Sequence, residues 1–331
     1  MNERLNWLSL LRGMNILLVV MFHVQLIDLS TGLNHTLCEQ ISLPFRYFRM
    51  PLFIFVSGGL LYLSRINKEW SSPRLYIDKA KRIMLPFIFF VTFFYCFKLL
   101  MTPFVKTKVE LSFSYFLESF VVYADHPSAH LWFLATLIEL MLLYPLYRWL
   151  CRSHLRMFFF GCFSVFFYYT DFSYLFDNNY FNITFFNRYL VFFFFGIAFF
   201  RYKFWRFITG SWLCFLLSLF SYVLCVFLQL SLLSSVAGIM MIISLSQLLD
   251  KYVPKLFSSF REYIFPIYLL SFVFQPFVEL ILWKRLFYCE PLLLLFYLIN
   301  VCAGIYGPVA VCKVVEHIPS RWVRYCFGLN R

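Results

Sequence analysis

Long apolar runs, each close to the length of one membrane crossing, dominate the hydrophobic pattern of the chain. A helix that crosses a bilayer needs about 20 mostly apolar residues. By that measure the sequence predicts ten membrane-spanning helices separated by polar segments. The predicted spans are 7–27, 43–63, 83–101, 130–148, 157–170, 183–200, 209–229, 231–249, 263–283 and 292–312. Almost nothing separates the seventh and eighth spans, so we expect a tight helical hairpin there, with one broken long helix as the alternative.

Composition excludes an ordinary soluble domain. Hydrophobic residues make up 62% of the chain and charged residues only 14%, whereas a soluble domain has a charged share of about 25%. We therefore expect an all-α, polytopic transmembrane bundle that forms a single domain over residues 1–331. The first apolar run lacks a small-residue cleavage site, so we expect it to be a retained helix. No spacing of Cys or His predicts a metal site.

The net charge of +13 is mainly a topology signal. If the N-terminus is cytoplasmic, most Lys and Arg residues fall in the segments that lie on the cytoplasmic side. This distribution follows the positive-inside rule and predicts that both termini are cytoplasmic. The cations also favour contact with anionic membrane lipid. We do not expect a nucleic-acid partner.

Two ionisable residues, Arg12 and His23, lie within the first span. On a helix they fall within about 20° of the same face and roughly 16 Å apart in depth. Charged groups in the hydrocarbon are costly and mark functional sites by default. The pKa of an ordinary histidine, near 6.5, suits a general base at neutral pH. The alternative is a structural polar pair bonded to neighbouring helices.

The second span contains the sequence MPLFIFVSGG at residues 50–59, with Arg46 and Arg49 just before it. Pro51 frees a backbone carbonyl, and the Ser-Gly-Gly step permits close backbone approach. The helix therefore either bends around a site or packs tightly, and ordinary helix packing explains the step equally well. The two arginines either contact a sugar or phosphate or extend to the interface.

A run of cations precedes the third span: Arg74, Lys79, Lys81 and Arg82. Clustered cations at a membrane surface can hold the phosphates of a nucleotide-like donor. The alternative is that these residues only set the topology.

His130 and Trp132 open the fourth span in the sequence HLWFL, residues 130–134. A tryptophan at the interface is expected as a membrane anchor. Its ring is also suited to stacking on the face of a sugar.

Acidic residues within spans need a partner or a proton. Glu139, deeper in the fourth span, either stays protonated or pairs with a cation, for which Arg12, His23 and Arg188 are the candidates. Arg188 lies in the sixth span. For Glu279 in the ninth span we expect a structural role.

Taken together, in this order and at these spacings, four stretches resemble the membrane acyltransferase-3 family of integral-membrane O-acyltransferases. They are Leu11-Arg12-Gly13 with Val19, Val20 and His23; Met50-Pro51-Leu52-Phe53 through Ser57-Gly58; Lys81-Arg82-Ile83 with Pro86; and the HLWFL stretch. The second has the form seen in the fucose 4-O-acetyltransferase-like branch. The resemblance spans most of the chain.

The resemblance implies that acyl-CoA, usually acetyl-CoA, is a co-substrate bound from the cytoplasm, with no separate cofactor. The acyl group passes to a hydroxyl of a surface glycan or its lipid-linked sugar precursor, at a bacterial cytoplasmic membrane. Direct transfer and an acyl-histidine intermediate both stay open. The predicted catalytic residues are His23, Arg12 and Glu139; the donor-binding residues are Arg74, Lys79, Lys81 and Arg82; the acceptor-binding residues are Arg46, Arg49, His130, Trp132 and Arg188.

Two positions depart from the family pattern. Ser9 stands where many relatives have an aspartate, which changes how Arg12 is held, and Ser271 stands where many have a histidine, which bears on the acceptor class. The main rival function is a transporter or flippase of polysaccharide precursors, which predicts repeated halves; no internal repeat is evident. A structural subunit is a third reading. The acyl group, the acceptor and the oligomeric state, including a homo-oligomer, stay open.

Overall fold

The computed structural model describes residues 5–27, 34–101, 109, 111–122, 126–170, 180–208, 210–286 and 289–329. Across these ranges the regular structure is helical, and the β-contact is an isolated bridge between Ile27 and Asn34. The all-α class predicted from the apolar runs is therefore confirmed. The chain divides into two compact units, Met1–Phe53 with Lys203–His317, and Ile54–Tyr202 with Ile318–Arg331.

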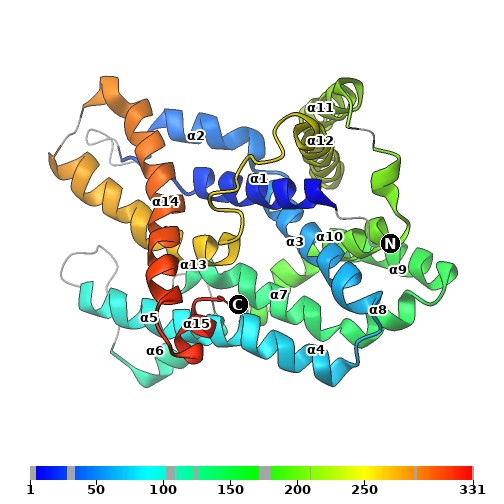
Figure 1. Ribbon diagram of the computed structural model, residues 1–331, viewed down its shortest axis with the longest axis horizontal. Helices are drawn as coiled ribbons and strands as arrows, with labels where there is room; N and C mark the ends of the chain where they lie inside the picture. Colours follow the sequence, from blue (N-terminus) through cyan, green and yellow to red (C-terminus); the bar gives the residue numbers. More distant parts are fainter. Residues whose placement is uncertain are drawn as a thin grey trace. The chain divides into compact units, whose positions relative to one another are not determined.

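The first unit is built around α1 (Asn6–Phe22). This helix packs against α12 (Ser231–Tyr252), α13 (Ile264–Phe277) and α14 (Leu293–Glu316) (Figure 1). Leu10, Leu11, Ile16 and Val20 of α1 are completely buried. A helix that buries apolar residues around most of its circumference is a core helix. Asn15, at 2% exposure, is held inside the protein, and Arg12 is partly buried.

Two further helices complete the first unit: α2 (Thr36–Ser42) and α11 (Trp212–Phe227). α11 packs along α12, as Figure 1 shows. Gln229, in the short connection between them, has a positive φ of 57°. The predicted helical hairpin is confirmed.

The second unit takes most of α3 (Arg49–Leu61), which begins in the first unit. Helix α10 packs against α9 and α7, and α15 packs against α5. Its other helices are α4 (Ser72–Lys79), α5 (Leu85–Met101), α6 (Phe113–Glu118), α7 (Trp132–Leu142), α8 (Tyr144–Leu150), α9 (His154–Tyr169), α10 (Ile183–Arg201) and α15 (Arg321–Cys326).

Glycines bring α3 and α10 into backbone contact. A Cβ atom on Gly58 would lie 2.1 Å from the carbonyl oxygen of Phe193, and one on Gly196 would lie 2.0 Å from the carbonyl oxygen of Phe55. The ring of Phe55 packs against that of Phe199, with 5.2 Å between centroids. The Ser-Gly-Gly step therefore serves close helix packing, one of the two readings of the sequence.

Pro51 leaves the carbonyl of Tyr47 without its usual helical donor, because proline has no N–H. The hydroxyl of Ser235 on α12 donates to that carbonyl over 2.6 Å. The predicted free carbonyl is thus present, and a neighbouring helix satisfies it.

Three helices contain π-helical segments in the part of the chain that the structure describes. Tyr62–Ile66 follows α3, Ala80–Met84 lies between α4 and α5, and Val278–Leu286 continues α13. A π-helical turn holds one more residue than an α-helical turn, and such turns occur often at functional sites.

Six described helices are long and apolar enough to cross a membrane, or seven if α7 and α8 count as one span. These two are bent by 52° relative to each other, inside the single span predicted over 130–148. Helices α1 and α11 are apolar but shorter. The count of ten spans is therefore not confirmed, and cytoplasmic termini and a single domain stay predictions.

Candidate functional site

His23 lies directly after the last residue of α1, and its place is fixed by two other helices. The side-chain amide of Gln275 on α13 donates to the carbonyl of Val20 over 2.9 Å. The hydroxyl of Tyr297 on α14 donates to the carbonyl of Met21 over 3.2 Å. Both carbonyls also accept from the backbone N–H groups of His23 and Val24, so each side chain adds a second hydrogen bond that holds the end of α1 against α13 and α14.

A cavity of about 90 Å³ opens beside His23, and Gln275 and Glu279 also line it. At about 30 Å³ for each water molecule, it has room for a few waters or for one hydroxyl group of a larger molecule. The ring of Phe272 packs on the imidazole with 4.6 Å between centroids. Glu279 is ion-paired with Lys284 at 3.0 Å, which agrees with its expected structural role, and its position also brings a carboxylate to the histidine cavity.

Asn15, a buried residue of α1, was not among the predicted site residues. With its amide turned to suit its neighbours, the nitrogen donates to the carbonyl of Arg49 over 3.1 Å and the oxygen accepts from the N–H of Phe53 over 3.2 Å. These two backbone groups stand in the i, i+4 relation of a helical hydrogen bond. Asn15 therefore ties α1 to the start of α3. A buried polar residue one turn after Arg12 is the sequence signal for it.

Three predicted arginines lie in the first unit. Arg12 is partly buried on α1, and the described residues offer it no hydrogen bond or ion pair. The guanidinium of Arg49 lies over the ring of Phe22, the neighbour of His23. Arg46 is exposed, 5.4 Å from the centroid of the Tyr47 ring. Arg49 is therefore the arginine of this group that the structure places next to the end of α1.

In the second unit, the side chains of Trp132 and His130 pack against aromatic rings. The Trp132 ring stacks on Phe185 and Tyr189, with 4.3 and 5.4 Å between centroids. The imidazole of His130 meets the edge of Phe94 at 4.2 Å. Stacked rings of this kind are stable packing on their own. The acceptor role predicted for these two residues stays a prediction.

Glu139 and Arg188 are not paired with each other in the described part of the chain. One carboxylate oxygen of Glu139 on α7 is buried and has no hydrogen-bond partner among the described residues. Arg188 on α10 is exposed. Arg188, one of the three candidate partners for Glu139, is therefore not paired with it in the described residues.

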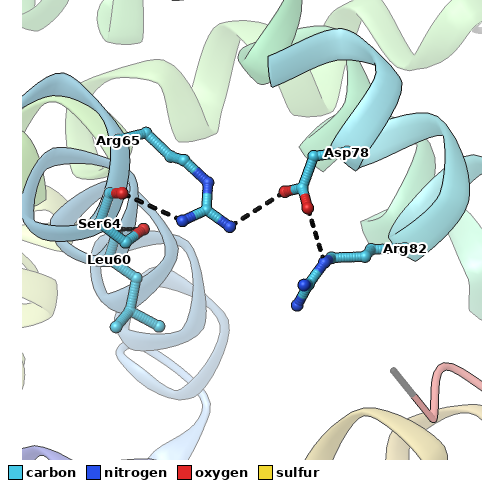
Figure 2. Close-up of polar contacts among 5 residues, drawn as sticks. All are labelled: Leu60, Ser64, Arg65, Asp78 and Arg82. Atoms are coloured by element: carbon cyan, nitrogen blue, oxygen red, sulfur yellow. Dashed lines mark hydrogen bonds and ion pairs between the residues drawn. The ribbon is translucent and has the colours of Figure 1, made fainter. Parts of the chain in front are cut away.

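A charged network joins the end of α3 to α4, and Figure 2 shows its geometry. Asp78 accepts from Arg65 at 3.0 Å and from Arg82 at 2.8 Å. Arg65 also donates to the carbonyl of Ser64 over 3.0 Å. Arg82, predicted to bind the donor, is thus partly neutralised within its own helix. Asp78 is the acid in a run of cations, four residues before Arg82, and that spacing is the signal for the pair.

The other predicted donor-binding residues surround this network. The guanidinium groups of Arg65 and Arg74 lie 3.9 and 4.0 Å from the centroid of the Trp70 ring. Lys79 is half-buried and Lys81 is exposed. The four predicted cations thus belong to one continuous helical segment.

The predicted residues fall in both units: Arg12, His23, Arg46 and Arg49 in the first, and Arg74, Lys79, Lys81, Arg82, His130, Trp132, Glu139 and Arg188 in the second. Apolar helices that carry a histidine beside a cavity and a network of arginines define a class, the polytopic membrane protein with internal charged sites. The acyltransferase-3 family, described as an acyltransferase domain, matches residues 5–313. The chain belongs to this family and is a multi-pass membrane acyltransferase. Comparison with curated proteins and with solved structures gave no match.

Proposed function

We propose that this acyltransferase moves an acetyl group from acetyl-CoA on the cytoplasmic side to a hydroxyl of a cell-surface carbohydrate or its lipid-linked precursor. The observation that carries the proposal is His23, an imidazole at the end of a core helix on the wall of a small cavity that Gln275 and Glu279 also line. The match to the family supports acyl transfer. The resemblance to the fucose 4-O-acetyltransferase-like branch supports a sugar acceptor in a bacterial cytoplasmic membrane.

In this proposal His23 is the general base. It takes the proton of the acceptor hydroxyl while the oxygen attacks the thioester carbonyl. A carbon–oxygen bond forms, the carbon–sulfur bond breaks, and the CoA thiolate leaves and takes up a proton. A positioned general base contributes about 10²- to 10⁴-fold in rate. An acyl-histidine intermediate would use the same residue as the nucleophile.

The intramembrane cations support the negative charge that develops on the carbonyl oxygen. Arg12 lies on α1 with no described partner, so its charge is available to a ligand. Arg49 is a second candidate, because its backbone is tied to Asn15 and its guanidinium lies over Phe22. Fixed cations in a site that excludes water stabilise developing charge more strongly than water does. Glu139 keeps its predicted catalytic role in the proposal, and one of its carboxylate oxygens is buried with no hydrogen-bond partner among the described residues.

The test is the release of free CoA thiol from acetyl-CoA by the purified protein with mixed cell-envelope glycans. We expect His23→Ala to lower glycan-dependent release by about 10²- to 10⁴-fold while the protein still folds in detergent. His317→Ala is the matched control, because His317 is exposed at the end of α14 and bonded to the carbonyl of Lys313. Normal turnover by His23→Ala would remove the base assignment. Glycan movement across vesicles without thiol release would favour a transporter.

A further inference from the structure

A second cavity, of about 210 Å³, lies in the second unit at the ends of three helical segments. Arg148, Arg152 and Arg201 line it together with Tyr62 and Glu69. Its walls come from the π-helical turn after α3, the end of α8 and the last residue of α10. None of these residues belongs to the predicted site.

Three arginines line this cavity, two of them four residues apart at the end of α8 and the third, Arg201, distant in the chain. Cations near the ends of helices are favourable on their own, because they face the negative end of the helix dipole. Three cations around one cavity are unfavourable without an anion, because like charges repel. Glu69 supplies one carboxylate against three cations, and it is exposed. The cavity therefore keeps an excess of positive charge.

Arg201 and Arg148 are partly buried, whereas Arg152 is exposed. The Nε atom of Arg201 is buried without a hydrogen-bond partner among the described residues. Its side chain interacts with the hydroxyl of Tyr62, which also lines the cavity. An anion bound in the cavity would compensate the charge of this guanidinium.

The chemistry of the cavity fits phosphate. Arginine presents its N–H groups as a planar fork that matches the oxygens of a phosphate. The volume of about 210 Å³ is smaller than the roughly 300–1,000 Å³ of cavities that enclose a drug-sized ligand. It therefore has room for phosphate groups rather than for a whole nucleotide.

The other basic region is less suited to this role. Asp78 already pairs with Arg65 and Arg82, and Arg65 and Arg74 lie over the Trp70 ring. A phosphate there would compete with an existing carboxylate.

We propose that the cavity formed by Arg148, Arg152 and Arg201 binds the phosphate groups of the acyl-CoA donor. This inference rests on the proposed function for the identity of the donor. An anionic lipid headgroup carries the same phosphate chemistry, so the experiment separates the two sources.

The probe is adenosine 3′,5′-bisphosphate, the phosphate-bearing end of CoA, titrated into protein purified in a neutral detergent. We expect Arg201→Gln and Arg148→Gln to weaken its binding by about 10- to 100-fold, as for the loss of a charge-assisted contact. Arg201→Lys should restore part of the affinity if Arg201→Gln folds poorly. Arg156→Gln is the matched control, because Arg156 lies over the Trp149 ring, 4.2 Å from its centroid, and does not line the cavity.

Kinetics provide the second readout. With acetyl-CoA, Arg201→Gln should raise KM with little change in kcat, whereas with S-acetylpantetheine, which lacks these phosphates, it should match the wild type. The proposal is overturned if the bisphosphate fails to bind the wild type, if Arg201→Gln behaves like Arg156→Gln, or if vesicles of phosphatidylglycerol displace the bisphosphate without affecting turnover of acetyl-CoA. Binding of the bisphosphate without acyl transfer from any donor would reject the proposed function and keep the phosphate site.

Discussion

Replacing Gly58 by alanine should separate α3 from α10 and lower stability by a large amount. The added Cβ would lie 2.1 Å from the carbonyl oxygen of Phe193, whereas ordinary contact begins at 3.4 Å. The helices must therefore move apart by about 1.3 Å, the difference between 3.4 and 2.1 Å. Overpacking costs about 1–3 kcal/mol. We expect the upper end, about 3 kcal/mol, because the obstructing atom belongs to a backbone that cannot turn away.

Gly161 on α9 provides the matched control. A Cβ atom there would meet the ring of Phe194 at 3.5 Å, an ordinary contact. Alanine is favoured over glycine inside a helix by up to about 1 kcal/mol. Gly161→Ala should therefore be neutral or slightly stabilising, although it makes the same chemical change as Gly58→Ala.

The assay is chemical unfolding of the purified protein in detergent, with binding of adenosine 3′,5′-bisphosphate measured beside it. Tyr62 and Arg201 lie just beyond this helix crossing, so Gly58→Ala should also weaken binding of the bisphosphate. The double variant with Gly196→Ala should cost less than the sum of the two changes, because the first separation makes room for the second methyl group. Equal stability of Gly58→Ala and Gly161→Ala would refute the reasoning.

Three further changes test other contacts. Asn15→Leu removes both hydrogen bonds to α3 and should lower the free energy of unfolding by about 1–3 kcal/mol. An unchanged unfolding midpoint would contradict the stabilising role of these two hydrogen bonds. Asp78→Asn should cost about 2 kcal/mol, between the values for exposed and buried pairs, and the reasoning fails if high salt abolishes this cost completely. Burial raises the pKa of the Cys151 thiol to about 11. In a variant whose sole cysteine is Cys151, the rate of iodoacetamide alkylation should therefore rise about tenfold per pH unit from pH 7 to 10. A rate that levels off near pH 9 would contradict this prediction.

The sequence predicts the helical segments well, because an apolar run is a local property. Pro51 and the Ser-Gly-Gly step are also local, so the freed carbonyl and the close helix approach were both expected. Their partners were not: Ser235, which donates to the Tyr47 carbonyl, and Phe193, which meets Gly58, are far away in the chain. The bend between α7 and α8 lies inside one apolar run, and hydropathy alone does not detect it.

The candidate sites also differ in whether their residues lie close together in the sequence. The predicted cations Arg74 to Arg82 form a cluster along the sequence, and such a cluster is easy to see. Arg148 and Arg201 are separated by two helices, and each alone resembles a cation that sets the topology. Only the packing of α8 and α10 against α9 brings them to one cavity. A site whose residues come from separate segments therefore cannot be identified by examining each segment alone.

The π-helical segments explain a further part of what sequence reasoning missed. Glu279 and Lys284 are five residues apart, and on an α-helix this spacing turns two side chains about 140° away from each other. In a π-helix residues i and i+5 are aligned, and the ion pair of 3.0 Å lies inside the π-helical segment Val278–Leu286. The pair thus depends on this helix form, which keeps a charged carboxylate neutralised on the wall of the His23 cavity. Lys284 also lies one residue beyond the predicted ninth span, 263–283, so the sequence pattern, which predicts a structural role for Glu279, does not identify its partner.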